Sequence, residues 1–242
     1  MHLIKVCVAV VLFQLSVFAA SDVWTGNVAE RFKSGLGKIE NPYIISTAEE
    51  FALMAKRYSD SAYYRLDADI VLNTGNAKDW ATSAPKNKWT VYGDTTKFAR
   101  VHLDGNGHSI SGLYINSDKD YQGLFGAWSG IATNIVIKNS YVKGRDFVGT
   151  LAGSFEYARL MSGCYNPFGN KAGGNIENIE ADVIVEGRKF VGGLVGLAGA
   201  TSAKFSSSWM INYSQKERIS KYDFNVLNID VSGRVKADSV VG

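Results

Sequence analysis

The chain has 242 residues, of which 46% are hydrophobic and 20% are charged, and it contains 25 glycines but only 3 prolines. This is a foldable composition, rich in glycine and aromatic residues, in a chain long enough to bury a sizeable core. The formal net charge is +3, from 26 basic and 23 acidic residues, and no long basic run is present that would follow a nucleic-acid backbone. We therefore expect no nucleic-acid partner.

Residues 1–20 have the pattern of a secretory signal peptide. Lys5 is their single cation, an apolar run covers residues 6–18, and small residues follow it. The alternative is a membrane anchor, but the run is shorter than the ~20 residues that a bilayer-spanning helix needs. We predict cleavage near Ala19 to Ser21, a secreted or bacterial cell-surface protein, and no transmembrane segment after cleavage.

Cysteine is scarce once this leader is removed. Cys7 lies in the leader, so Cys164 is expected to be the single cysteine of the mature chain, and no intrachain disulfide can form. Cys164 could be a nucleophile or an intermolecular link, or simply a small apolar side chain in a turn-rich loop. We favour the loop interpretation because a reactive thiolate needs a partnering base.

Residues 21–62 predict a linker and capping segment with one helix near 47–58. Ser46 and Glu49 have the spacing of a capping box, in which the hydroxyl accepts from a backbone amide of the first turn and the glutamate accepts from the cap's own amide. The apolar positions that follow recur at three and four residues: Phe51, Met54, Ala55 and Tyr58.

From residue 63 onward, apolar and polar residues alternate with the period of a β-strand. The first such segment is 63–73, and the Asp-Gly-Asn-Gly sequence at 104–107 predicts a turn. Further strands are expected at 134–144, 178–187 and 224–233.

Two segments repeat at an interval of 43 residues: VKGRDFVGTLAG at 142–153 and VEGRKFVGGLVG at 185–196. A looser third copy places Val231 and Arg234 at an interval of 46, so residues 63–242 are predicted to be repeats that the C-terminus truncates. The repeat-defining glycines are Gly144, Gly149, Gly153, Gly187, Gly192, Gly196 and Gly233.

Short strands with a fixed repeat and glycine at their ends favour a parallel β-solenoid, an all-β fold in which each turn of chain stacks about 4.8 Å from the next. In this fold Gly144, Gly187 and Gly233 are expected at corners, where a residue with a Cβ resists the backbone conformation. The alternative is a sandwich or barrel of antiparallel hairpins, which does not need a repeat.

Several segments resemble bacterial surface proteins that carry the GLUG motif, over roughly residues 40–200. The matching segments are LDGNGHSISGLYIN at 103–116, GLFG at 123–126, VGTLAG at 148–153 and VGGLVG at 191–196. Members of that family include immunoglobulin A peptidases and adhesin-like proteins. The resemblance implies a right-handed parallel β-helix with a surface role and not a reaction. Thr150 and Ala152 depart from the motif, and GLFG lacks the leading Val-Gly.

Candidate metal ligands are few. His102 and His108 flank the predicted turn with Asp104 and Asn106, but calcium needs more carboxylates and zinc needs a third nitrogen or sulfur ligand. Ile115 stands where a calcium loop has its bidentate glutamate. We predict a turn and no metal or other cofactor.

Candidate catalytic residues are equally sparse. Asp67 and Asp69 would share one face of a strand, as carboxylate pairs of glycan-cleaving enzymes do, but Arg65 beside them favours a solvated outer face. Serine-nucleophile, phosphate-loop and zinc-peptidase motifs are absent from the sequence. We predict no catalytic residues, and no enzyme in this chain.

Aromatic residues gather in the polar loop at 76–98 and shortly after it: Trp80, Trp89, Tyr92, Phe98 and Trp128. Such rings can stack on sugars, so Trp80, Trp89, Tyr92 and Trp128 are candidate glycan-binding residues. Alternatively they cover the open end of the solenoid together with the helix. A second insertion, at 201–224, is expected to project between strands, where binding often resides.

These patterns predict a non-enzymatic, secreted or surface-displayed segment of an adhesin-like protein. Its repeats would form a stalk, and its loops would bind a glycan or a host or cell-surface ligand. The alternative is the N-terminal module of a larger secreted peptidase or polysaccharide-degrading enzyme whose catalytic domain lies outside this chain.

Overall fold

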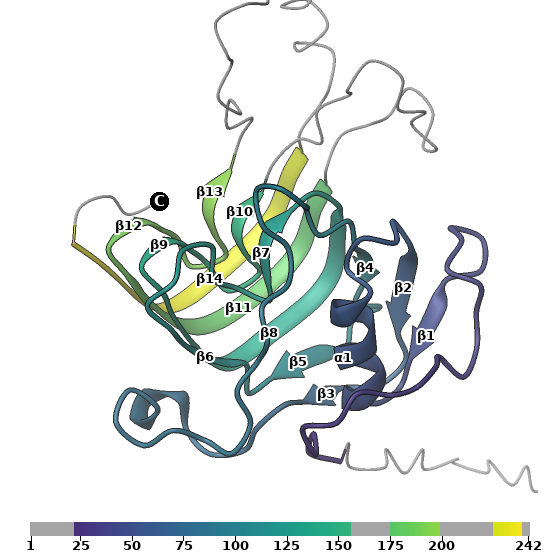
Figure 1. The fold of residues 1–242 in the computed structure, drawn as a ribbon, viewed down its shortest axis with the longest axis horizontal. Helices are drawn as coiled ribbons and strands as arrows, with labels where there is room; N and C mark the ends of the chain where they lie inside the picture. The colour runs from purple at the N-terminus through teal and green to yellow at the C-terminus, as the bar shows by residue number, and fades with distance from the viewer. Residues whose placement is uncertain (1–21, 156–174, 199–224, 239–242) are drawn as a thin grey trace, which may run out of the picture.

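A computed structural model describes residues 22–155, 175–198 and 225–238 of the chain. Within these residues every pairing between two named strands is parallel. The strands form three sheets, of nine, three and two strands. Figure 1 shows the long strands of the largest sheet curving side by side, with the one described α-helix near its N-terminal end.

The largest sheet is built around three thirteen-residue strands, β8 (Ile131–Lys143), β11 (Asn175–Gly187) and β14 (Asn225–Ala237). Its shorter strands are β1 (Tyr43–Ile45), β2 (Tyr63–Leu66), β3 (Ile70–Val71), β4 (His102–Asp104), β5 (Ser109–Ser111) and β6 (Tyr114–Asn116). Strands β4, β5 and β6 all pair with β8, one after another along its length. One long strand therefore aligns three short segments of the preceding chain.

Two smaller sheets complete the fold. One contains β7 (Phe125–Trp128), β10 (Ala152–Phe155) and β13 (Val195–Ala198), and the other contains β9 (Asp146–Val148) and β12 (Lys189–Val191). A 3-10 helix, η1 (Ala77–Asp79), lies in the long connection between β3 and β4.

Helix α1 (Ala48–Lys56) begins one residue later than the predicted capping box. Thr47 is the N-cap, and its Oγ1 accepts a hydrogen bond from Glu50 N at 3.2 Å. The Glu50 carboxylate accepts from Ser46 N at 2.9 Å, so the acid that closes the cap is Glu50 and not Glu49. Seven of the nine helical residues are buried, which packs the helix within the core instead of leaving an outer face in solvent as a terminal cap would.

The predicted right-handed parallel β-helix is wrong, although parallel strands dominate. Tyr43 pairs with Tyr64, Tyr63 with His102, and His102 with Ile131, which are intervals of 21, 39 and 29 residues. The strands also divide into one sheet of nine and two small sheets. Because neither interval nor strand length is constant, the chain is a parallel β fold of unequal sheets instead of a regular solenoid.

The two segments that match at 43 residues lie side by side. Val185 pairs with Val142, and Val191 pairs with Val148. All four valines are fully buried. The third copy is displaced by four residues from its predicted alignment, since Val183 and not Gly187 lies opposite Gly233.

The glycines have different roles from those predicted. Gly233 has a φ of +114°, and a Cβ there would lie 2.0 Å from the Val183 carbonyl oxygen. Gly144 and Gly187 do not have positive φ, and a Cβ at either would instead meet a Val148 methyl group at 2.8 Å. The corner explanation is therefore wrong for these two, where glycine makes room for side chains.

The other repeat glycines allow close approach of backbone segments. An added Cβ at Gly149, Gly153 or Gly196 would meet backbone atoms at 2.5 to 2.6 Å. Gly192 N donates to the Val148 carbonyl oxygen at 3.0 Å, which holds two neighbouring segments together.

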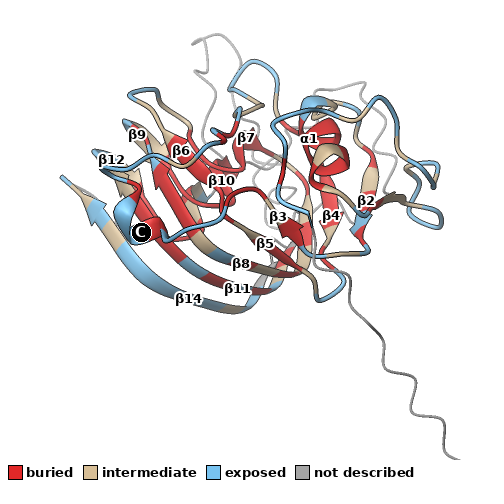
Figure 2. Ribbon diagram, turned by 90° about the horizontal axis from the view of Figure 1, so that it is seen from below, coloured by how far each residue is buried: buried red, intermediate tan, exposed pale blue. Residues whose placement is uncertain are grey.

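A continuous apolar core lies between the sheets and around α1 (Figure 2). Its largest fully buried side chain is Trp128, which contacts Phe155 with ring centroids 4.5 Å apart. The C-terminal strand β14 is mostly exposed, with Leu227 50% and Val231 39% exposed. The core thus forms the inside of the stack of strands and thins toward β14.

Several sequence predictions fall outside the described residues: the signal peptide at 1–20, Cys164 and the insertion at 201–224. In the part that the structure describes, no helix combines the length and apolar content needed to cross a membrane.

Candidate binding groove

The two candidate metal-binding histidines have separate environments. His102 is 8% exposed and its ring stacks on Tyr63, with centroids 4.6 Å apart, and burial lowers its pKa to about 4. His108 is half-buried, with Nδ1 3.5 Å from an Asp69 carboxylate oxygen. Across residues 22–155, 175–198 and 225–238, no cluster of three or more His, Cys, Asp or Glu side chains could hold a metal ion.

The aspartates considered as a catalytic pair do not share a strand. Strand β2 ends at Leu66 and β3 begins at Ile70, so Asp67 and Asp69 both lie in the turn between them. Ser109 N donates to Asp69 at 2.8 Å. Burial opposes ionisation of Asp69, but the hydrogen bonds from Ser109 outweigh it and lower the pKa of this carboxyl. The prediction of one strand through 63–73 is wrong at this turn.

The tryptophans predicted to lie at the surface are buried. Trp80, Trp89 and Trp128 are 3%, 4% and 0% exposed. The indole Nε1 atoms of Trp89 and Trp128 donate to backbone carbonyl oxygens of Leu124 and Val101, each at 3.0 Å. Their faces are therefore covered by protein, and the prediction that these three rings are available to a sugar is wrong.

Tyr92 is half-buried and lines a groove with a volume of about 820 Å³. The groove lies between residues 88–94 and 115–122, and it is completed by Tyr58 beyond α1 and Lys143 at the end of β8. Its volume falls in the range of about 300–1,000 Å³ that is usual for small-molecule sites. Of the candidate aromatic residues, Trp89 and Tyr92 are brought to this groove, and Trp80 and Trp128 are not.

Tyrosine rings occur on both sides of the groove. Tyr58 and Tyr92 stack with centroids 5.6 Å apart, and the Lys97 ammonium lies 5.2 Å from the Tyr58 ring centroid. Across from them, Tyr121 stacks on Phe147 at 4.6 Å with nearly parallel planes, 6° apart. Because each ring is held by a neighbour, the aromatic walls lose little conformational entropy when a ligand binds.

Tyr121 belongs to a ladder of three rings whose backbones share one conformation. Phe147 stacks on Phe190 at 4.8 Å and 5°. The three residues have φ values of 56°, 59° and 54°, in the left-handed region. Parallel strands repeat at about 4.8 Å, so the same unusual turn in successive strands places the rings one above another at stacking distance.

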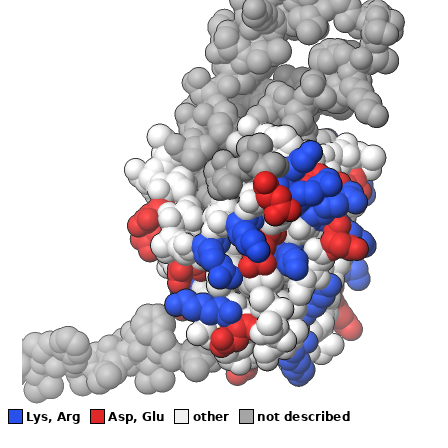
Figure 3. Space-filling model, turned by 90° about the vertical axis from the view of Figure 1, so that its left-hand side faces the viewer, with Lys and Arg blue, Asp and Glu red and all other residues white. Residues whose placement is uncertain are grey.

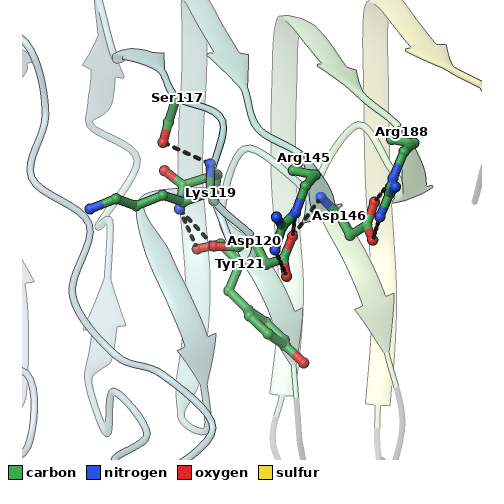
Figure 4. A network of polar contacts seen from close by, with 8 residues as sticks. Ser117, Lys119, Asp120, Tyr121, Arg145, Asp146 and Arg188 are labelled. Atoms are coloured by element: carbon green, nitrogen blue, oxygen red, sulfur yellow. Dashed lines mark hydrogen bonds and ion pairs between the residues drawn. The ribbon is translucent and has the colours of Figure 1, made fainter.

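A ladder of ion pairs runs beside these rings (Figure 4). Arg145 contacts both carboxylate oxygens of Asp120, at 2.6 and 2.7 Å, and Arg188 contacts both of Asp146, at 2.8 and 2.6 Å. The arginine hydrogen bonds lower the pKa of each carboxyl. Figure 3 shows basic and acidic side chains interspersed on the face that carries the ends of β9 and β12.

Sequence patterns missed most of the groove. Tyr58 was expected on the buried face of the helix, and nothing local marks Tyr121, Lys119 or Lys143 as neighbours of Tyr92. The signal that could have found Tyr121 is its register with Phe147 and Phe190, one residue after a charged position in each segment.

No protein-family model matches the chain. A provisionally named Gly-rich membrane protein of Evansella cellulosilytica is 31% identical over 115 residues, which are 46% of this chain and 12% of that protein. Halomucin of Haloquadratum walsbyi is 30% identical over 184 residues, 73% of this chain and 2% of that protein. The chain therefore spans only a small part of the length of these relatives.

A similar fold occurs in a solved structure of a provisionally named immunoglobulin A1 protease from Bacteroides ovatus. The TM-score is 0.56 and the sequence identity is 22%, over 84% of this chain and 51% of that chain. At this identity the similarity concerns the fold and carries no activity across.

Proposed function

We propose that this chain is a secreted or cell-surface segment of an adhesin-like protein, and that it binds a glycan in the groove between residues 88–94 and 115–122. The names of the two relatives, a Gly-rich membrane protein and halomucin, support a surface setting. The resemblance to GLUG-motif proteins belongs to the same proposal. No reaction is assigned to the groove.

The observation that carries the proposal is the pair of tyrosine walls. Tyr92 and Tyr121 line one groove from two segments, and each is stacked on a second aromatic ring. Sugar rings present apolar C–H faces that pack on aromatic rings, while their hydroxyl groups need polar partners at the rim. Asn116 and Ser117 supply such groups in the same lining.

A glycan array with the full chain tests the proposal, followed by calorimetric titration of the best ligand against variants. Tyr92→Ala removes one wall, and Tyr121→Asn removes the other while keeping a residue that tolerates a φ of 56°. Tyr63→Ala is the matched control, because Tyr63 is also half-buried and ring-stacked but lies outside the groove.

We expect each groove variant to weaken binding about ten-fold, the loss of roughly one aromatic contact, and the control to bind as the natural chain does. The proposal fails if no glycan binds the natural chain, or if Tyr63→Ala weakens binding as much as the groove variants do.

A further inference from the structure

We infer that the ligand of this groove is an anionic glycan, one whose sugars carry carboxylate or sulfate groups. The inference rests on the proposed function and names its ligand class. It starts from three lysines that line the groove: Lys88, Lys119 and Lys143. All three are exposed, and none takes part in the ion pairs found among the described residues.

The acidic residues of the lining are mostly committed to other groups. Asp120 is held by both nitrogens of Arg145. The Asp94 carboxylate accepts hydrogen bonds from Thr96 N and Lys97 N, each at 2.8 Å. Asp118 is left as the one lining carboxylate without such a partner in the described structure, and it faces three ammonium groups.

The backbone positions of two of these lysines are fixed by the strand pairing. Lys143 ends β8 opposite Asn116 of β6, and its carbonyl oxygen accepts from Ser117 N at 3.1 Å. The Lys119 carbonyl oxygen accepts from Arg145 N at 2.8 Å. Figure 4 shows the Lys119 side chain extending away from the Asp120–Arg145 pair, so its ammonium is not directed into that ion pair.

The acid nearest to Lys143 across the sheet is also occupied. Glu186 pairs with Lys143 in the register of β11 and β8. Its carboxylate accepts from Arg234 at 3.1 Å and from the Tyr141 hydroxyl at 3.1 Å. Lys143 is therefore available to an acidic group of a ligand in the groove.

Tyrosine walls and unpaired lysines together match an acidic sugar better than a neutral one. The ring faces would pack on Tyr92 and Tyr121, and the acid groups would lie against the ammonium groups at the rim. Each exposed charge contact contributes modestly, and because the lysines are at the surface the attraction is screened by salt.

The test compares three polymers on the full chain: polygalacturonate for carboxylate, dextran sulfate for sulfate, and dextran as the neutral polymer. The groove variant is the double change Lys119→Gln and Lys143→Gln. The matched control is Lys56→Gln with Lys138→Gln, two exposed lysines outside the groove. Binding is measured at about 0.05 M and about 0.5 M salt, where the screening length falls severalfold.

We expect at least one acidic polymer to bind and dextran not to. We also expect the groove double variant to lose about five- to ten-fold in affinity at low salt, and the control to lose less than about two-fold. The acidic polymer that remains bound at higher salt identifies the preferred acid group.

Two outcomes overturn the inference and are distinguishable. If a neutral glycan binds through Tyr92 and Tyr121 as well as the acidic polymers do, the acidic ligand class is wrong while the proposed function stands. If the control lysines matter as much as the groove lysines, the polymers bind a diffuse basic surface and the groove is not their site.

Discussion

His102 makes the stability of this protein depend on pH in a way that can be isolated. Its ring is 8% exposed, and burial lowers its pKa from 6.5 to about 4. The folded state thus disfavours the protonated imidazole, whereas the unfolded state binds the proton below about pH 6.5. This contribution to stability is complete above pH 6.5 and is lost as the pH falls toward 4.

The two pKa values set the size of the effect. The difference of about 2.5 units predicts a loss in the free energy of unfolding of about 2 kcal/mol at pH 5 and about 3 kcal/mol at pH 4, on the linkage relation. Carboxyl groups with lowered pKa values, such as Asp120 and Asp146, also lose stabilisation in acid, in the same direction. A variant that lacks only the imidazole separates the two contributions.

His102→Phe is that variant, because a phenyl ring can stack on Tyr63 as the imidazole does. Urea unfolding of both proteins at pH 7.5, 5 and 4 gives the difference in the free energy of unfolding. We expect the natural chain to lose about 3 kcal/mol more than His102→Phe between pH 7.5 and 4, while the carboxyl contributions cancel. Parallel loss in the two proteins would refute the argument that His102 is buried in its neutral form.

Three further changes test the packing. Gly233→Ala should open strand β14, measured as faster amide hydrogen exchange, because a Cβ meets the Val183 carbonyl; Gly107→Ala, also at positive φ but with open space, should not speed exchange there. Trp128→Ala should lower the free energy of unfolding by about 3–5 kcal/mol in urea titration, and Trp128→Phe by clearly less; equal losses would contradict a packed indole. Asn178→Ala should destabilise by about 1 kcal/mol more than Asn178→Gly, since both remove the amide that donates to Asn134 at 2.9 Å but only alanine resists the φ of 55°; thermal melting that ranks them in the opposite order would refute this.

Local chemistry was predictable where it depends on neighbours in the sequence. The helix over 48–56 follows from apolar residues at intervals of three and four with a hydroxyl and a glutamate at its start, although the two possible caps, Ser46 and Thr47, could not be ranked. The strand at 178–187 lies within β11 for the same reason, an uninterrupted alternation of apolar and polar residues. The 43-residue offset also reappears as the pairing of Val191 with Val148.

The positions of the turns were only partly predictable. Asn-Gly pairs mark a turn at 104–107, and Asn106 does adopt a φ of 51°. The left-handed residues between long strands are Asn134, Asn178 and Asn228 rather than glycine. Their amides form a ladder, with Asn228 donating to Asn178 at 2.9 Å, and such stacking depends on which strands are adjacent.

By itself, the sequence determined the β-rich class, the one described helix, and the pair of segments that lie together at 43 residues. Only the tertiary structure decided that the sheets are unequal, that Trp80, Trp89 and Trp128 are buried, and that Tyr58, Tyr92 and Tyr121 share a groove. The physical reason is that helix and strand formation respond to residues a few positions away. Burial and the composition of a groove depend instead on which distant segments pack over a side chain, and a tryptophan in a polar loop is equally compatible with either environment.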